Sequence, residues 1–301
     1  MNECDGTAGV IVRVWTAVDE CGNESTCEQI ITVIDDEIPN LICPPDVTLN
    51  CDQETDPSIA GGSAIAADNC TSTENITITF ADRNGGTLSD CGGNAGVIIR
   101  VWTAVDACGN EATCEQIITV VDESAPVISC VADITVSCDA DQTPAATGEA
   151  TATDNCSDAA NISITFTDQN GGSLSDCGGT AGSFIRVWTA VDECGNETTC
   201  EQIITVIDDS APILDCPADL TLSCDEERAP SATGEASATD NCTATGDITI
   251  TFADSNGGVL ADCGGNSGVI LRTWTAVDAC GNETTCAVSY THLTLPTIYS
   301  V

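Results

Sequence analysis

The sequence has no lysine, a single histidine and few aromatic residues, and each scarcity excludes a class of function. Six arginines stand against 48 acidic residues, which gives a formal net charge of −42. Because phosphate groups repel so acidic a surface, neither nucleic acid nor an anionic membrane is expected as a partner. The one histidine lies outside the repeats described below. No hydrolytic triad can therefore form within them, and no enzymatic activity is expected.

Long apolar runs are also missing. No stretch of 18 or more apolar residues exists, so no membrane insertion is expected. Met1 is followed by an acidic segment and not by the apolar core of a signal peptide. Cysteine, in contrast, is abundant, and its 21 copies occupy recurring positions, which indicates disulfides formed in an oxidising compartment. The expected location is extracellular or at the cell surface, with this chain a fragment of a longer protein.

The motif Trp-Thr-Ala-Val-Asp-x-Cys-Gly-Asn-Glu occurs four times, about 86 residues apart, and the sequence between its copies also repeats. Acidic linkers that end in proline, at 35–39, 122–126 and 208–212, mark the boundaries of a tandem array. The predicted domains are a C-terminal half-repeat at 1–36, repeats at 37–122 and 123–208, a repeat at 209–289 that lacks its last strand, and a non-repeat tail at 290–301. This tail is similar to the adapter-derived ends of translated metagenomic reads and is expected to be artefactual.

Each repeat contains short β-branched segments separated by turn residues, and none shows the periodicity of a helix. In the first complete repeat the predicted strands are 41–50, 61–67, 75–81, 97–105 and 113–121. The pattern predicts an all-β fold of tandem immunoglobulin-like β-sandwich domains, rich in disulfides and arranged as a rod. Ile98, Trp102 and Ala104 alternate along one predicted strand and are assigned to the core. Arg100 has the same phase, which predicts a guanidinium stacked on the Trp102 indole.

Five spaced elements of each repeat resemble those of a known module. After an Asp-x-x-x-Pro start they are Cys43-Pro44, Asp68-Asn69, Ala104-Val-Asp106, Gly109-Asn110 and Thr113-Cys114. Over about 275 residues the chain resembles the hyalin-repeat (HYR) module, in the version found in large secreted surface proteins of Bacteroidota-type bacteria. The resemblance implies an immunoglobulin-like fold and an extracellular adhesive or spacer role without catalysis. Two features depart from the family pattern: Val131 and not proline follows Cys130, and six cysteines per repeat exceed the usual number.

Six cysteines allow 15 pairings, among which the sequence alone does not choose. In a sandwich, the cysteines that begin the first and last strands share one end, as do those in the loops after 61–67 and after 97–105. Those after the first strand and before 97–105 share the opposite end. The predicted disulfides are Cys43–Cys114, Cys51–Cys91, Cys70–Cys108, Cys130–Cys200, Cys138–Cys177, Cys156–Cys194, Cys216–Cys286, Cys224–Cys263 and Cys242–Cys280. A zinc site is the alternative, but the close pairs are too widely spaced and no histidine lies in the repeats.

Acidic and amide side chains are expected to gather where a linker meets the next repeat, and calcium binds such oxygen ligands. The predicted ligands at one such meeting point are Asp122, Glu123, Asp154, Asn155, Asp192 and Asn196, with Asp82 and Asn84 from the preceding repeat. The alternative is that these are ordinary turn residues that cap their own backbone, on a surface whose charge serves solubility. No complete calcium-loop motif is present.

The leading functional hypothesis is a non-enzymatic extracellular segment, an adhesive stalk or spacer of a bacterial cell-surface protein. Its expected partners are an unknown surface ligand, protein or glycan, and further repeats of the same chain. The alternative is a spacer array in a secreted multidomain hydrolase whose catalytic domain is absent from this fragment. Glycan binding by the repeats themselves is less favoured, because so few aromatic side chains offer a stacking platform.

Overall fold

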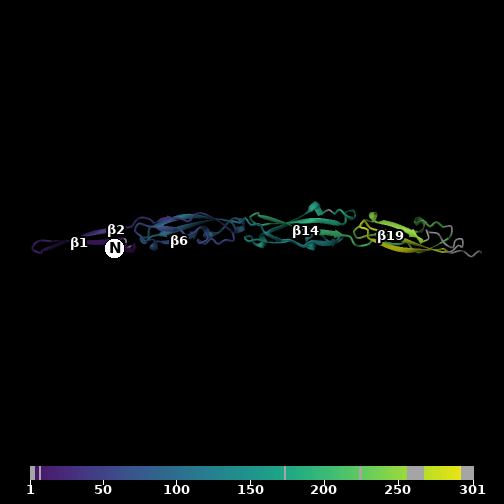
Figure 1. Cartoon of the computed structure of the whole chain (residues 1–301), viewed down its shortest axis with the longest axis horizontal. Coiled ribbons are helices and arrows are strands. Elements are labelled where there is room, and N and C mark those ends of the chain that lie inside the picture. The colour runs from purple at the N-terminus through teal and green to yellow at the C-terminus, as the bar shows by residue number, and fades with distance from the viewer. Residues whose placement is uncertain (1–3, 7, 173, 224–225, 256–267, 293–301) are drawn as a thin grey trace, which may run out of the picture. The chain divides into compact units, whose positions relative to one another are not determined.

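The computed structural model describes residues 4–6, 8–172, 174–223, 226–255 and 268–292. The chain divides into two compact units. The first contains Met1–Val127, Ala152–Ser163 and Ala190–Thr198, and the second contains Ile128–Thr151, Ile164–Thr189 and Thr199–Val301. Strands make up most of the regular structure of both units, so the predicted all-β class of disulfide-rich tandem repeats is confirmed (Figure 1).

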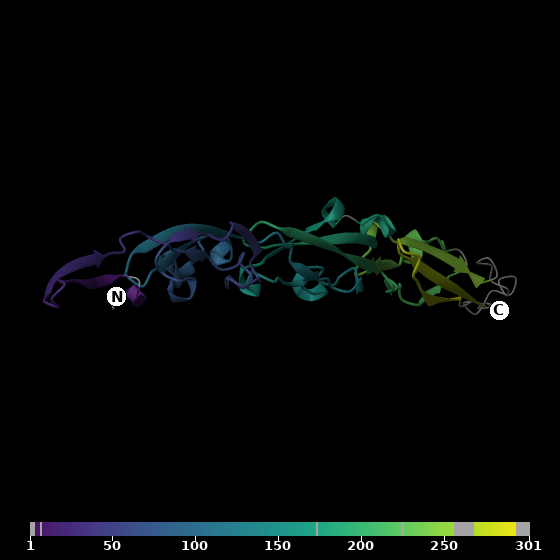
Figure 2. The ribbon, with the colours of Figure 1, turned by 60° about the vertical axis from the view of Figure 1, so that its left-hand side comes forward.

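Helices in the described part of the chain are single turns (Figure 2). The two α-helices each begin at a proline and end before a glycine of positive φ: α1 (Pro144–Thr147) and α2 (Pro230–Thr233). The 3-10 turns are η1 (Cys4–Gly6), η2 (Thr73–Asn75), η3 (Arg83–Gly86), η4 (Cys91–Gly93), η5 (Ala159–Asn161), η6 (Gln169–Gly172), η7 (Cys177–Gly179) and η8 (Thr245–Asp247). No helix among the described residues is long and apolar enough to cross a membrane.

In the first unit, two sheets enclose a core. Their strands are β3 (Asn40–Ile42) and β5 (Ile65–Ala67) in one sheet, and β4 (Val47–Asn50), β8 (Glu111–Val121), β7 (Gly96–Val105) and β6 (Thr77–Asp82), in that order, in the other. All pairs are antiparallel except β4 with β8, which is parallel. Ala66 of the small sheet packs with Ile76 and Ala104 at the large one, so the layers form a β-sandwich.

The predicted strand 41–50 is two strands, β3 and β4, which belong to different sheets. Pro44 and Pro45 lie between them and have no N–H to donate to a ladder. Asp46 then accepts a hydrogen bond from the Ile117 N–H at 2.8 Å, where the parallel pairing of β4 with β8 begins. The chain therefore changes sheets at the Pro-Pro step, which the alternation of apolar residues does not reveal.

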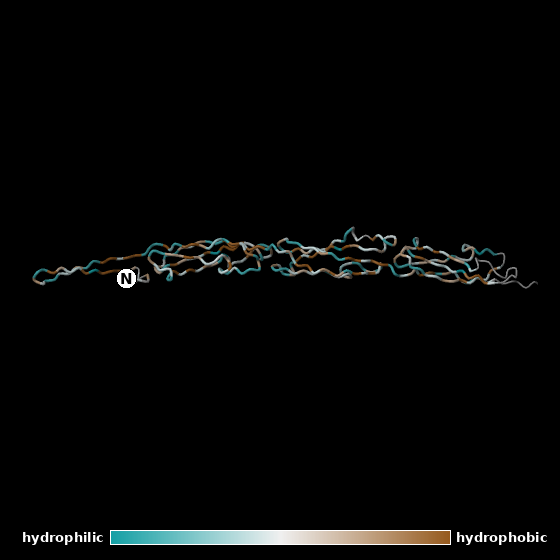
Figure 3. Tube along the Cα trace, in the orientation of Figure 1, coloured by the Kyte–Doolittle hydropathy of each residue, from teal (hydrophilic) through white to brown (hydrophobic). Residues whose placement is uncertain are grey.

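Strand β7 carries the central core side chains, as predicted. Ile98, Arg100, Trp102 and Ala104 are buried and their neighbours are not. Figure 3 shows both apolar and polar residues along the strands. The Trp102 indole N–H donates to the Gln116 side chain at 3.2 Å. The pairing of polar groups inside the sandwich lets this strand bury an arginine and a tryptophan next to each other.

The same two-sheet pattern recurs along the chain, with four-stranded orders β10-β14-β13-β12 and β16-β20-β19-β18. Their strands are β10 (Ile134–Ser137), β12 (Ser163–Asp168), β13 (Gly182–Val191), β14 (Glu197–Ile207), β16 (Leu220–Leu222), β18 (Thr249–Asp254), β19 (Gly268–Val277) and β20 (Glu283–His292). The two-stranded sheets are β9 (Val127–Ser129) with β11 (Thr151–Thr153), and β15 (Ile213–Asp215) with β17 (Ser237–Thr239). At the N-terminus, β1 (Gly9–Val18) and β2 (Glu24–Val33) form a two-stranded hairpin with both faces exposed.

The repeat at 209–289 does not lack its last strand, contrary to the prediction. Strand β20 runs from Glu283 to His292 and pairs with β19 along its whole length and with β16. Val288 and Tyr290 alternate into the core and are at most 2 % exposed, so this sequence keeps the inward phase although its residues differ from the other repeats. The described part of the predicted tail is thus a core strand, and 293–301 lie outside the described residues.

Candidate functional site at the linkers

One disulfide closes each sandwich internally, as predicted. These bonds are Cys43–Cys114, Cys130–Cys200 and Cys216–Cys286, with Cα atoms 6.0, 5.9 and 6.4 Å apart. Each joins the end of the first small-sheet strand to the last strand of the same repeat. The separations lie in the ordinary range for disulfides.

The other disulfides join consecutive repeats, which corrects the prediction. They are Cys4–Cys108, Cys51–Cys156, Cys91–Cys194, Cys138–Cys242 and Cys177–Cys280, with Cα separations of 4.6, 5.8, 4.8, 5.9 and 4.7 Å. They replace the predicted pairs Cys51–Cys91, Cys70–Cys108, Cys138–Cys177, Cys156–Cys194 and Cys242–Cys280. Cys70 has a free thiol. The predicted pair Cys224–Cys263 lies outside the described residues.

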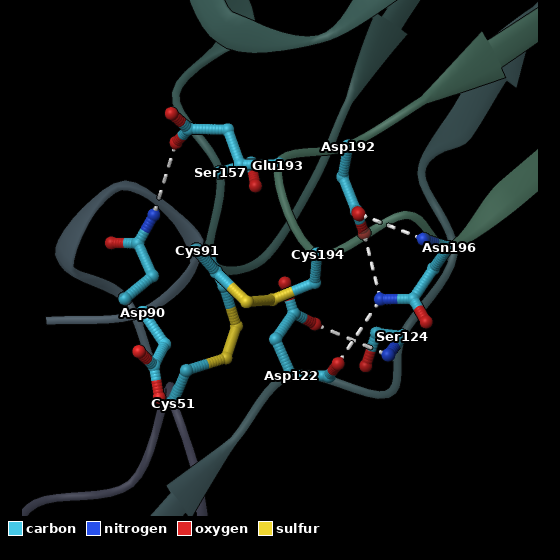
Figure 4. Close-up of a disulfide and its surroundings, with 12 residues drawn as sticks. Cys51, Asp90, Cys91, Asp122, Ser124, Ser157, Asp192, Glu193, Cys194 and Asn196 are labelled. Carbon is cyan, nitrogen blue, oxygen red and sulfur yellow. Dashed lines mark hydrogen bonds between the residues drawn. A yellow bond between two sulfur atoms is a disulfide. The ribbon is translucent and has the colours of Figure 1, made fainter. Parts of the chain in front are cut away.

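The physical reason for the difference is where the ends of the sandwiches meet. Cys51 and Cys91 do lie near each other, at the end where the linker leaves the first complete repeat (Figure 4). The loops 152–163 and 190–198 of the following repeat belong to the same compact unit and bring Cys156 and Cys194 to them. Assigning cysteines to ends is therefore sound, but a cysteine at an end bonds across to the next repeat.

A tight turn orients the cysteine before β7 out of its own repeat. Cys91 has φ 48°, in the left-handed region that non-glycine residues rarely adopt, and Gly92 follows at φ 67°. Asp90 and Ala95 pair across this turn. A Cβ at position 92 would meet the end of the flexible Glu193 side chain, which can move away, so the positive φ is what favours glycine there. The equivalent cysteines Cys4 and Cys177 have φ 48° and 51°.

Three aspartates meet beside each linker, and each group of three is called an aspartate cluster here. The clusters are Asp35/Asp68/Asp106, Asp122/Asp154/Asp192 and Asp208/Asp240/Asp278, and within each one carboxylate oxygen per residue lies within 4.8 Å of the other two. The first member comes from the linker, the second from the Asp-Asn turn after β5 or its equivalent, and the third from the end of the tryptophan strand. Three separate turns thus converge on one point in every repeat.

Hydrogen bonds around the second cluster fix the positions of its carboxylates (Figure 4). Asp192 accepts from the backbone N–H and side-chain amide of Asn196, both at 2.9 Å. The same Asn196 amide donates to the Asp122 carbonyl at 3.1 Å, and Asp122 Oδ1 accepts from the Ser124 N–H. The Gly-Asn pair of the repeat motif therefore ties the linker to the loop. Asn110 and Asn282 make the same bond to the linker carbonyls of Asp35 and Asp208.

Burial and mutual repulsion act on the linker aspartates. Loss of hydration raises the pKa of Asp122, and the charges of Asp154 and Asp192 raise it further. The pKa of Asp208 is raised for the same reasons, with Asp240 and Asp278 as the neighbouring charges. The pKa of Asp35 is also raised, first by desolvation and then by the charge of Asp68. Each linker carboxylate is thus held in a place that disfavours its unpaired negative charge.

The structure brings together only part of the predicted calcium set. Asp122, Asp154 and Asp192 form the cluster and Asn196 braces it. The Asn155 side-chain amide lies against the Cys156 sulfur at 2.9 Å, and Glu123 is exposed.

From the preceding repeat, Asp82 forms a bidentate ion pair with Arg100. The side chain of Asn84 lies outside the described part. Repetition in the sequence does not separate the cluster from its neighbours, because Asp82 also recurs, as Asp168 and Asp254.

Comparison with known proteins gives distant structural likenesses. No protein-family model and no curated protein matches the chain. Among solved structures, mouse cadherin-23 EC22–24 is 15 % identical with a TM-score of 0.34, covering 86 % of this chain and 100 % of that one. Drosophila N-cadherin EC1–4 is 15 % identical with a TM-score of 0.29, covering 95 % and 84 %. At these scores no residue role is transferred from them.

Proposed function

We propose that this chain is a non-enzymatic, HYR-like extracellular segment that acts as an adhesive stalk or spacer of a bacterial cell-surface protein. The supporting observation is that disulfides cross from each repeat to the next. An unknown surface ligand, protein or glycan, is the partner that such a stalk would present. Calcium is the cofactor that we propose for it, since an aspartate cluster lies at each linker.

Stiffness is the property that the crossing disulfides supply. Repeats 37–122 and 123–208 are connected by the linker itself and by Cys51–Cys156 and Cys91–Cys194. A single connection acts as a hinge, whereas three connections restrict both bending and twisting of one repeat against the next. Cys138–Cys242 and Cys177–Cys280 do the same for the following pair. Such bonds limit the motion of one repeat against the next without a continuous core.

Electron spin distances test this proposal. Labels carried by non-natural amino acids at the exposed positions Thr77 and Ser163 report the freedom between two successive repeats. A narrow distance distribution is expected in the oxidised chain. It broadens when Cys51, Cys91, Cys156 and Cys194 are all replaced by serine.

The matched control removes an internal disulfide through Cys43→Ser and Cys114→Ser, and the distribution is then expected to stay narrow. A distribution of equal width with and without the crossing disulfides would count against a stiff stalk. The chelator-treated protein serves for these measurements, so the role of the disulfides is measured apart from that of any cation.

A further inference from the structure

The linker aspartates have buried oxygens that no group in the described part of the chain satisfies. Asp122 is 7 % exposed and Asp208 is 8 % exposed. In each, Oδ2 has no hydrogen-bond partner among the described residues. Buried polar atoms in native structures nearly always have a partner, so a buried carboxylate oxygen without a protein partner indicates a bound water or ion.

The unpartnered oxygens belong to members of the aspartate clusters. Asp154 Oδ2 and Asp240 Oδ2 are also buried without a partner, and each belongs to the same cluster as its linker aspartate. The turns use the other oxygen: Asp154 Oδ1 accepts from the Cys156 and Ser157 N–H groups, both at 2.8 Å. Backbone capping therefore accounts for one oxygen of Asp154 and leaves the second free for a ligand.

Positive side chains of the sandwich cores are engaged elsewhere. Arg100, Arg186 and Arg272 form ion pairs with Asp82, Asp168 and Asp254, which lie outside the clusters. Three carboxylates that share one buried place without such a partner repel one another. Either a cation or a shared proton must relieve that repulsion.

We infer that each aspartate cluster is the binding site of one hard divalent cation of calcium size, held by the linker aspartate and two aspartates of the next repeat. Oxygen-only ligands favour such a cation over zinc. An ion about 2.4 Å from each ligand oxygen places opposite oxygens about 4.8 Å apart. One oxygen from each carboxylate lies within 4.8 Å of the other two, a spacing compatible with one ion between the three carboxylates.

This site deepens the proposed stalk and rests on it, because the cation would fix the linker to the repeat that follows. Its ligand set differs from the sequence prediction. Glu123 and Asp82 are replaced by a three-aspartate core that recurs at the linkers 35, 122 and 208. Waters complete the coordination shell, since calcium takes six to eight oxygens.

Calorimetric titration of the whole oxidised chain with calcium at neutral pH, after treatment with chelator, tests the site. Three saturable sites per chain are expected, one for each cluster. Asp122→Asn reduces the number to two, and Asp122→Asn with Asp208→Asn reduces it to one. Calcium is expected to bind more tightly than magnesium, which holds its water shell more strongly and demands a stricter geometry.

Glu123→Gln and Asp209→Asn are the matched controls, since each removes the same charge from the neighbouring linker position, which is exposed. Both are expected to keep three sites. Absence of saturable binding at millimolar calcium, equal loss in the control variants, or magnesium binding as tight as calcium would each overturn the inference.

Asp154→Asn tests a second ligand of the same cluster and should also reduce the number of sites to two. A disulfide map of every variant verifies that the variant has folded. The spin-label widths of the chelated protein separate the two proposals. A stiff chain that binds no calcium refutes the cation site alone, and a flexible chain that binds calcium refutes the stalk alone.

Discussion

At the scale of single residues, the buried arginine of each repeat shows what a strand pattern does and does not predict. The alternation along β7 correctly assigns Arg100 to the core face, where it is 2 % exposed. Its partners come from the neighbouring strand: Asp82 lies opposite Arg100, and the guanidinium lies 4.4 Å from the Phe80 ring centroid. The predicted stack on Trp102 is not the one observed in this repeat. The sequence of one strand shows which side chains face the core. The side chains that they contact depend on the register between two strands.

Replacing Arg100 by alanine should destabilise its repeat by about 3 kcal/mol, because it leaves the Asp82 carboxylate largely buried without its counter-charge. Hydrogen exchange of the β6–β7 amides measures this cost locally. Arg83→Ala is the control: its ion pair with Glu115 is exposed, so a change below about 1 kcal/mol is expected. Equal losses of amide protection in both variants would show that the buried ion pair stabilises the repeat no more than the exposed one.

The linker aspartates predict an unusual response to pH in the absence of divalent cations. Desolvation first, and then Asp154 and Asp192, raise the pKa of Asp122 above its ordinary value of 3.8. The folded state therefore binds this proton more readily than the unfolded state. Stability at this linker should rise as pH falls from neutral through the raised pKa, and the gain should be complete below the ordinary value.

Hydrogen exchange near residues 122–124, corrected for the intrinsic effect of pH, should slow as the pH falls from neutral to below the ordinary value of 3.8. Asp141 is the internal control, because the Thr143 N–H and hydroxyl lower its pKa. The stability of that turn is present above the ordinary pKa and lost as pH falls through the lowered one. Asp122→Asn should remove the effect at the linker only. Unchanged protection at 122–124 across this range would contradict the raised pKa.

At the scale of elements, the sequence identifies the strands better than their membership in sheets. The segments 97–105 and 113–121 correspond to β7 and β8 within two residues at each end. The segment 41–50 was harder, since an apolar run does not show where Pro44 and Pro45 move the chain from one sheet to the other. The last strand of the final repeat was missed because its residues differ, although their alternation places Val288 and Tyr290 correctly inward.

Tyr290→Ala should therefore destabilise the final repeat by about 3–5 kcal/mol, the usual cost of removing a buried aromatic ring. The ring packs with Ile270, Trp274 and Val288. Proteolysis or hydrogen exchange along β19 and β20 reports the effect. Thr285→Ala changes an exposed position of the same strand and should alter stability by no more than about 0.5 kcal/mol. Full protection in Tyr290→Ala would mean that β20 is not a core strand.

At the scale of the whole molecule, repetition in the sequence predicts the tandem sandwiches but not the bonds between them. Cysteines occupy equivalent positions in the repeats. The sequence therefore does not distinguish a disulfide within one repeat from a disulfide to the next repeat. The choice depends on how close consecutive ends approach, which the Cys-Gly-Gly turn and the Asn196 bond to the linker determine. For the same reason, the sequence predicts Asp122, Asp154 and Asp192 as calcium ligands but does not exclude Glu123, which the structure leaves exposed.

Disulfide mapping of the oxidised chain tests the central claim most directly. Digestion with pepsin at low pH suppresses thiol exchange, and mass spectrometry then identifies the joined peptides. The crossing pairs Cys51–Cys156 and Cys91–Cys194 are expected together with the internal pair Cys43–Cys114, and Cys70 should be alkylated as a free thiol. Peptides joined as Cys51–Cys91 or Cys70–Cys108 would instead show repeats that are closed within themselves and connected only by their linkers.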